Sequence, residues 1–298
     1  MHKNAANHSQ ANGAKYETPA AMMRYLETIQ ELPTLSSVAI KVNSMLQDAD
    51  VTARDLSDVI EKDQAMVAKL LKLVNSSFFG FSSKVSNIAH SIMILGFNTV
   101  YNAILSMAVI DALGAKNRIN GLDMAGFWRH AISVAVVSKY LSQGLEGQLQ
   151  EKAFTAGILH DIGKVVMARY FTERFSTLWE VITLQEISFV KAERQHFPMG
   201  HDAMGAFLSR CWNLPEELST AVAQHHHPEI LPRPCVLALV VNAADALVNI
   251  HLENRKMPDQ WAISNAAKSL LGEKIRTVDQ WFPTIVDEIN AAQHSILD

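Results

Sequence analysis

Apolar residues recur every three or four positions along most of the chain, which is the spacing of amphipathic helices. Neither a sustained alternation of apolar and polar residues nor an Asn-Gly or Asp-Gly turn between apolar runs stands out, so strands are not expected. The pattern therefore predicts an all-α protein. In the first half the expected helices begin at Thr18-Pro19, span residues 35–47, begin at 53 and 63, and span 86–95 and 98–113.

Local capping signals support several of these helix starts. Thr18 followed by Pro19 combines a capping hydroxyl with a proline at the first helical position. Thr52-Ala53-Arg54-Asp55 resembles a capping box in which Asp replaces the usual Glu. Asp63 is placed to cap the next helix.

Residues 114–122 contain two glycines, two asparagines and two basic positions, and they form the clearest interior boundary. The histidines that could do chemistry nearly all follow this boundary. We therefore expect a disordered arm over residues 1–16, an N-terminal helical subdomain over 17–114 and a site-bearing helical domain over 120–298. Helices in the last part are expected over residues 124–142, around the pair 160–161, and over 172–184, 188–196, 201–212, 215–225 and 236–249, with two weaker outer helices in 261–297.

The composition describes a globular protein rather than a fibrous or membrane-spanning one. Of 298 residues, 49% are hydrophobic and 19% are charged, with a net charge of −4 and no cluster of Lys and Arg, which argues against nucleic-acid binding. No apolar run reaches the roughly 20 residues that span a bilayer, and no signal peptide is recognisable. The cytoplasm is the expected location. The two cysteines, Cys211 and Cys235, fit a reducing compartment and are expected to be buried as small hydrophobic residues.

The stretch from Gly157 to Val166 is the most informative part of the chain. Seven of its ten residues are apolar or Gly, yet it contains His160, Asp161 and Lys164. Burying charged groups costs several kcal/mol unless they are paired, hydrogen-bonded or bound to a metal. We interpret the stretch as part of a metal site, intact or vestigial.

Further polar residues lie beside apolar helical faces in the second half. Imidazole and carboxylate ligands suit Fe, Mn, Zn or Ni, whereas two cysteines are too few for thiolate ligation. Adjacent side chains point about 100° apart on a helix, so His160 and Asp161 can share an ion only at a helix end or distortion, which Gly163 would permit. The candidate residues are His130, His160, Asp161, Lys164, His201, His225, His226, Asn242 and Asp245.

His130, the pair His160-Asp161 and a late Asp resemble the signature of the HD superfamily of metal-dependent phosphohydrolases. Residues 158–164, His201 with Gly205, and the pair at 225–226 are similar to its HD-GYP phosphodiesterase branch. The chain resembles more closely the HDOD family, the HD-related output domains of bacterial signalling proteins, over roughly residues 20–250. This resemblance is carried by residues 32–35, 63–79, 88–96, 127–130 and 212–215.

The resemblance implies an N-terminal helical bundle packed on an HD-like helical domain. It also implies that the metal ligands, or their relics, are His130, His160, Asp161, His201, His225, His226 and a late Asp. In an active enzyme of this kind Asp161 and Lys164 would be catalytic residues, with Lys164 neutralising a bound phosphate and a metal-bound hydroxide attacking phosphorus.

The sequence also departs from these patterns. The glycine-rich HD-GYP signature is missing after His227, and His227 stands where a Glu is expected. Gly126 occupies a position at which that branch can place an acidic ligand. The late acidic ligand has two readings: alignment of Asp245-Ala246-Leu247 puts Asn242 at the ligand position, or Asp245 itself reaches the site.

Three functional hypotheses follow. The first is a signalling module that holds a metal and binds a protein partner, with binding rather than catalysis as its main role. The second is a metal-dependent phosphohydrolase or cyclic-dinucleotide phosphodiesterase whose ligand is a phosphorylated or cyclic nucleotide. The third is a structural relic whose histidines are hydrogen-bonded in the core. None of the three involves a nucleic-acid or membrane partner.

Overall fold

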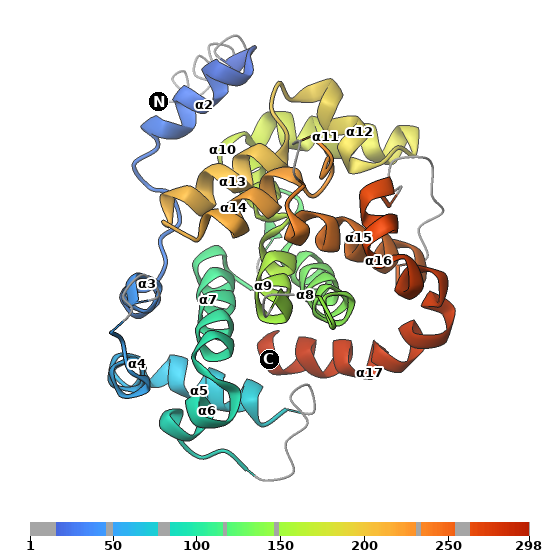
Figure 1. Ribbon diagram of the computed structural model, residues 1–298. Coiled ribbons are helices and arrows are strands. Elements are labelled where there is room, and N and C mark those ends of the chain that lie inside the picture. Colours follow the sequence, from blue (N-terminus) through green and yellow to red (C-terminus); the bar gives the residue numbers. More distant parts are fainter. Residues whose placement is uncertain are drawn as a thin grey trace.

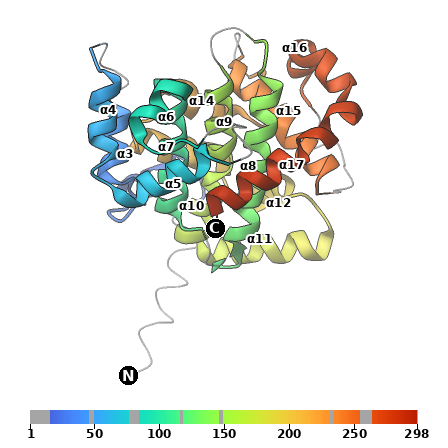
Figure 2. The ribbon, with the colours of Figure 1, turned by 90° about the horizontal axis from the view of Figure 1, so that it is seen from below.

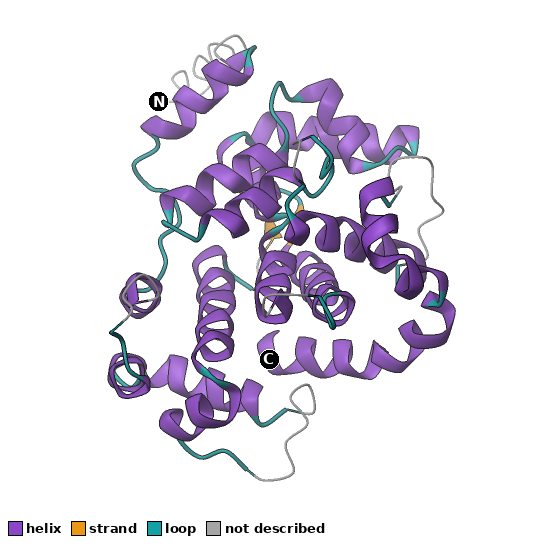
Figure 3. Cartoon of the chain, in the orientation of Figure 1, coloured by secondary structure: helices purple, strands orange, loops and turns teal. Residues whose placement is uncertain are grey.

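The computed structural model (Figure 1) describes residues 16–45, 50–76, 84–115, 118–145, 149–230, 234–253 and 263–297. Helices make up nearly all of the regular structure in these ranges, as Figure 3 shows in purple, which confirms the all-α prediction. Most of the expected arm, residues 1–15, lies outside the described part. The first-half helices are α2 (Pro19–Thr28), α3 (Ser37–Met45), α4 (Ala53–Ile60), α5 (Gln64–Val74), α6 (Ile88–Leu95) and α7 (Phe97–Leu113).

The predicted caps form where the sequence places them. The Thr18 hydroxyl accepts a hydrogen bond from the backbone N–H of Ala21, and Asp63 accepts one from the N–H of Met66. Thr52 and Asp55 form a complete capping box. Two starts lie two residues later than expected. Helix α3 begins at Ser37 rather than at residue 35, and the Ser36 hydroxyl accepts from the backbone N–H of Ala39. Helix α6 begins at Ile88 because Asn87, rather than Ser86, caps it.

The second half contains longer and more deeply buried helices. In α8 and α15 most side chains are buried, so both are central helices. The helices are α8 (Met124–Leu141), α9 (Leu149–Leu159), α10 (Ile162–Tyr170), α11 (Thr172–Gln185), α12 (Phe189–His196), α13 (His201–Cys211), α14 (Glu216–Gln224), α15 (Val236–His251), α16 (Asn265–Arg276) and α17 (Val278–Leu297).

A small hairpin corrects the expectation that Asn-Gly turns are absent. β1 (Arg118–Ile119) pairs antiparallel with β2 (Leu122–Asp123) across Asn120 and Gly121, both of which have positive φ. Such a pair is the usual turn of a two-residue hairpin. The flanking strands have only two residues each, which is too short to produce a visible alternation in the sequence. The hairpin lies in the predicted boundary and lines one side of the site.

The two halves share one hydrophobic core across that boundary. Helix α7 packs on α9, and the Trp212 indole donates to the carbonyl of Pro33 at 2.7 Å. Asn43 joins the halves again, because it donates to the carbonyl of Asn213 and accepts from the hydroxyl of Tyr101. The N-terminal helices are therefore fixed against the part of the chain that carries the candidate site.

The last two helices wrap the outside of this core, as expected. Helix α16 packs on α15, while α17 crosses α8 and continues to α5 of the N-terminal half, as seen from below in Figure 2. Within the described residues no single helix is long and apolar enough to cross a membrane; α6 and α7 pass this test only as a pair bent by 119°.

The expectation of two buried cysteines is wrong. Cys211 is exposed and Cys235 is half-buried. Cys211 is the last residue of α13 and follows Ser209, the last buried residue of that helix, so the apolar pattern around it did not place it in the core.

Candidate metal centre

The helix that contains the central motif breaks at its polar pair. Helix α9 ends at Leu159 and α10 begins at Ile162, so His160 and Asp161 lie in the turn between them. Both side chains are buried, with 1% and 2% of their surface exposed. Adjacent residues can converge on one site only at a helix end or a distortion, and His160 and Asp161 lie at a helix end.

Gly163 brings the next helix against this turn. Gly163 was expected to permit a distortion of the helix, but its backbone has an ordinary helical conformation. A Cβ atom at Gly163 would lie 1.8 Å from the carbonyl oxygen of His201, so only glycine allows α10 and α13 to pack so closely. Gly157 does the same for α9, because its Cβ would lie 2.5 Å from Cα of Ala135 on α8. Close packing at these two glycines carries His160 and Asp161 toward histidines on neighbouring helices.

One side of Asp161 faces a group of three histidines. Its Oδ1 lies 3.0 Å from Nε2 of His201 and 3.8 Å from Nε2 of His225. Nε2 of His226 lies 3.1 Å from Nε2 of His201. His201 is the first residue of α13, and His225 and His226 directly follow the end of α14. Helix termini therefore supply all three histidines.

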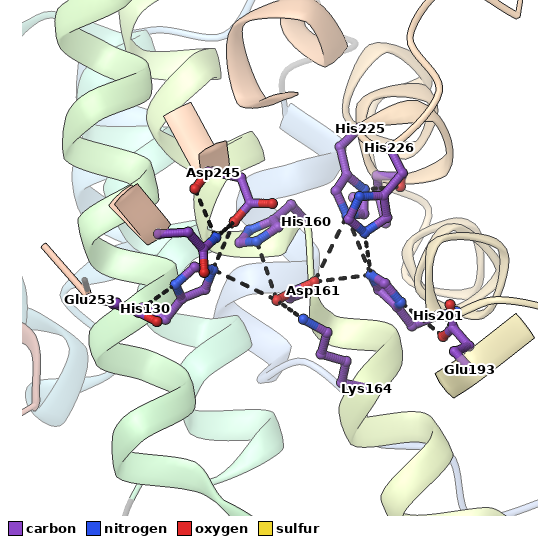
Figure 4. A network of polar contacts seen from close by, with 12 residues as sticks. His130, His160, Asp161, Lys164, Glu193, His201, His225, His226, Asp245 and Glu253 are labelled. Carbon is purple, nitrogen blue, oxygen red and sulfur yellow. Dashed lines mark hydrogen bonds and ion pairs between the residues drawn. The ribbon is translucent and has the colours of Figure 1, made fainter. Parts of the chain in front are cut away.

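The other side of Asp161 faces a second group. Its Oδ2 lies 3.3 Å from Nε2 of His160 and 3.9 Å from Nε2 of His130. Nε2 of His130 also lies 3.1 Å from Oδ1 of Asp245 on α15. Figure 4 shows the Asp161 carboxylate between the two groups of side chains.

All seven residues proposed as ligands therefore converge. Asp161, His201, His225 and His226 each offer one ligand atom within 4.8 Å of the others, and so do His130, His160 and Asp245. A metal ion bonds nitrogen and oxygen ligands at about 2.0–2.2 Å, so the ligands of one ion lie at most about 4.4 Å apart. Small side-chain shifts suffice to close each group around an ion.

Hydrogen bonds at the outer ring nitrogens orient four of the histidines. Nδ1 of His130 contacts Glu253 at 2.7 Å, and Nδ1 of His201 contacts Glu193 at 2.8 Å. Nδ1 of His160 and of His225 face backbone carbonyl oxygens at 2.7 and 2.8 Å. A partner at Nδ1 fixes the ring and leaves Nε2 to face the centre, as in metal-binding histidines.

Neither orienting carboxylate, Glu193 or Glu253, is among the residues singled out from the sequence. Glu193 carried a signal, because it lies on the buried stripe of α12 with Phe189 and Ala192, where an acidic residue needs a partner. It also accepts from the backbone N–H of His201. Glu253 follows the end of α15 and carried no comparable signal.

The two readings of the late acidic ligand are now distinguishable. Both polar atoms of the Asn242 amide serve the backbone: its nitrogen donates to the carbonyl of His225, and its oxygen accepts from the N–H of Ser264. Asp245 contacts His130 instead. The geometry therefore assigns the acidic position to Asp245 and gives Asn242 a structural role.

Three further residues singled out in the sequence lie around the centre. The Lys164 ammonium forms an ion pair with Oδ2 of Asp161 and lies 4.8 Å from the ring centre of Phe189. Nε2 of His227 contacts Arg194, outside both ligand groups. Gly126 lines the pocket in front of the site.

The charges of the centre are strongly coupled. Burial lowers the pKa of His201, but Glu193 and Asp161 raise it more, to about 10. Burial likewise opposes protonation of His130, whose pKa is raised to about 9 by Asp245 and Glu253. Burial and the neighbouring histidines lower the pKa of His225 to about 3. The metal-free centre thus holds protons on some rings and excludes them from others.

Two buried atoms test whether a metal fits. Nε2 of His160 and Oδ1 of Asp161 have no hydrogen-bond partner of ordinary geometry in the part of the chain that the structure describes. Leaving such an atom buried and unsatisfied costs about 1–3 kcal/mol. Each atom faces one ligand group, and an ion in that group would satisfy it. The residues present therefore fit a metal.

A pocket of about 690 Å³ opens onto the His130 side of the centre. Arg118, Arg129 and Lys164 supply positive charge to its wall, Asp123, Asp161 and Glu253 supply negative charge, and Phe127 and Trp179 supply aromatic surface. Its volume lies within the usual range for small-molecule sites. A small organic ligand could therefore reach the centre.

Together, the helical fold and the histidine–aspartate centre define the class as HD-related helical proteins. The HDOD domain model matches residues 32–228, and the chain belongs to the HDOD family. The matched region contains six of the seven candidate ligands, with Glu193 and Lys164 beside them, whereas Asp245 and Glu253 lie beyond it.

Solved structures share the fold. An HDOD domain protein of unknown function from Geobacter sulfurreducens superposes with a TM-score of 0.78 at 22% identity, covering 92% of this chain and 96% of that one. A candidate phosphohydrolase from Shewanella amazonensis gives 0.73 at 22% identity, covering 91% and 97%. An uncharacterized protein of Treponema pallidum is 26% identical over 202 residues, which are 67% of this chain but only 39% of that relative.

Proposed function

We propose that the protein is a cytoplasmic signalling module of the HDOD family that binds two divalent transition-metal ions. The carrying observation is the position of Asp161, whose two oxygens face two separate groups of ligand atoms. One ion would be held by Asp161, His201, His225 and His226, and the other by His130, His160 and Asp245, with Asp161 between them. Fe, Mn, Ni or Zn suits these nitrogen and oxygen ligands.

Binding rather than catalysis is the main role in this proposal. The Lys164 ammonium is already paired with Asp161, which reduces its availability for a bound phosphate. Gly126 supplies no additional acidic ligand. We expect the partner to be another signalling protein, and we expect neither nucleic acid nor a membrane surface to be bound.

The second candidate is a metal-dependent phosphohydrolase or cyclic-dinucleotide phosphodiesterase, and the pocket with Arg118 and Arg129 in its wall favours it. Metal ions in such a centre would supply an activated water and stabilise charge on a phosphoryl group. Arg118 and Arg129 would hold the anionic ligand, while Asp161 and Lys164 would act at the reacting phosphate.

Elemental analysis tests the metal proposal. Protein produced in medium supplemented with iron and manganese should contain close to two transition-metal ions per chain, and His160→Ala should lose at least one of them. His227→Ala is the matched control, since this histidine adjoins the ligand pair but lies outside both groups. Wild-type protein with no bound metal, or equal losses in the two variants, would refute the proposal.

The same preparations distinguish binding from catalysis. Phosphomonoesters, nucleotides and cyclic dinucleotides are incubated with metal-loaded protein, and phosphate or linear products are measured. The main proposal expects binding without turnover. Turnover that disappears in His160→Ala and persists in His227→Ala would instead establish the phosphohydrolase.

A further inference from the structure

Helix α17 lies beyond the region matched by the family model and packs both on α8, which carries His130, and on α5 of the N-terminal half. It follows α16 in the chain, crosses α8 and reaches α5 (Figures 1 and 2). Asn290 and Gln293 on this helix form part of the pocket wall. One helix therefore contacts both the pocket wall and the N-terminal half.

Gln293 contacts the helical turn that presents His130. Its side-chain nitrogen donates to the carbonyl of Arg129 at 3.1 Å and to the hydroxyl of Ser133 at 3.0 Å. The Ser133 hydroxyl itself donates to the Arg129 carbonyl at 2.7 Å. These bonds enclose His130 within one turn of α8, so Gln293 influences where the His130 ring lies.

The start of α17 is anchored, and the rest follows a proline. The ring of Trp281 stacks on Tyr140 with centroids 4.3 Å apart, and its indole donates to the carbonyl of Lys274. Pro283 follows two residues later inside the helix. A proline removes one helical hydrogen bond and permits bending at that point. The segment after Pro283 can therefore shift while Trp281 stays in place.

The same segment contacts the N-terminal half. Lys72 on α5 donates to the carbonyl of His294, the neighbour of Gln293, at 3.4 Å, and α17 packs on α5. Ile285, Ile289 and Ala292 are buried on the inner face of the segment. Gln293 and the residue that contacts Lys72 are therefore neighbours on one helix.

We propose that Gln293 is a positioning residue for His130, and that α17 couples metal binding at His130, His160 and Asp245 to the packing of α17 on α5. This inference rests on the proposed metal centre. Coupling between two sites is reciprocal, so loosening α17 weakens metal binding, and metal binding protects α5.

Hydrogen exchange and metal titration of the full chain test this inference. Gln293→Glu keeps the shape of the side chain but removes its N–H donors, and Gln293→Leu removes them without adding charge. Gln280→Glu is the matched control, because Gln280 is exposed on the same helix before Pro283. The probe is Mn²⁺ or Zn²⁺ alone.

In metal-free protein both Gln293 variants should speed amide exchange in residues 129–133, in α17 after Pro283 and in α5, while Gln280→Glu matches wild type. On titration, the affinity of one of the two ions should fall about five- to tenfold, which is within the usual range of coupling between sites, and the other should be unchanged. Metal should slow exchange in α5 of wild-type protein but not of the Gln293 variants.

The failures are distinguishable. Wild-type protein that binds no metal would refute the proposed function, while the metal-free exchange still decides whether Gln293 positions the turn. If both Gln293 variants show the same amide exchange in α5 and the same affinities for both metal ions as wild-type protein, the proposed coupling is wrong and the metal centre is unaffected.

Discussion

Gly163→Ala tests the packing on which the candidate centre depends. The added Cβ would lie 1.8 Å from the carbonyl oxygen of His201 and 2.7 Å from the backbone nitrogen of Gly205, where ordinary contact begins at 3.4 Å. Helices α10 and α13 must therefore separate by about 1.6 Å. Both obstacles are backbone atoms, so no change of rotamer can relieve the clash.

The expected loss of stability is about 3 kcal/mol, the upper part of the usual range for overpacking a core. Since His201 moves with α13, its Nε2 should also withdraw from Asp161, and metal held by Asp161, His201, His225 and His226 should bind at least tenfold more weakly. Urea unfolding measures the stability, and metal titration measures the affinity.

Gly272→Ala is the matched control, because Gly272 also lies within a helix but no atom lies within 4 Å of its added Cβ. This substitution should stabilise the protein by about 0.5–1 kcal/mol through helix propensity. The packing argument is wrong if the free energy of unfolding of Gly163→Ala lies within about 0.5 kcal/mol of the wild-type value and the variant keeps its metal affinity.

Three further predictions concern the ligands and the residues that hold them. Glu193→Gln and Glu253→Gln should each weaken metal binding about 10–100-fold by loosening an orienting hydrogen bond; titration of each variant measures this, and wild-type affinities would contradict the assigned role. Asp245→Asn should lose one ion, whereas Asn242→Ala should keep both and lose about 1–3 kcal/mol of stability through unsatisfied backbone groups; elemental analysis and urea unfolding separate them, and the opposite pattern would restore Asn242 as the ligand. Metal affinity should rise with pH between 7 and 9 by up to about tenfold per unit. Burial lowers the pKa of His201 but Glu193 and Asp161 raise it to about 10, so metal binding must displace a proton from this ring. Calorimetry in buffers of different ionisation enthalpy should detect the released proton, and an affinity that does not change with pH would contradict the prediction.

Local rules account for most of the secondary structure. Thr18, the box from Thr52 to Asp55, and Asp63 cap the helices that they were expected to cap, because each interaction spans only three residues. The hairpin at Asn120-Gly121 was missed because two-residue strands leave too short a pattern to recognise. Cys211 was misplaced because residue type alone does not decide where along a helix the buried face ends.

The sequence by itself determined that the protein is helical and which residues compete for a buried polar centre. His130, His160, Asp161, His201, His225 and His226 were identifiable because charged or titratable side chains are costly among apolar neighbours unless they are satisfied. That argument depends on composition and periodicity, which are local properties.

Only the tertiary structure decided how these residues divide into two groups around Asp161. It also decided that Asp245 rather than Asn242 completes one group, and that Glu193 and Glu253 orient the rings. These relations depend on how closely α10 approaches α13 and how α15 lies across α8. Helix approach is a property of packed surfaces far apart in the chain, and sequence spacing does not record it.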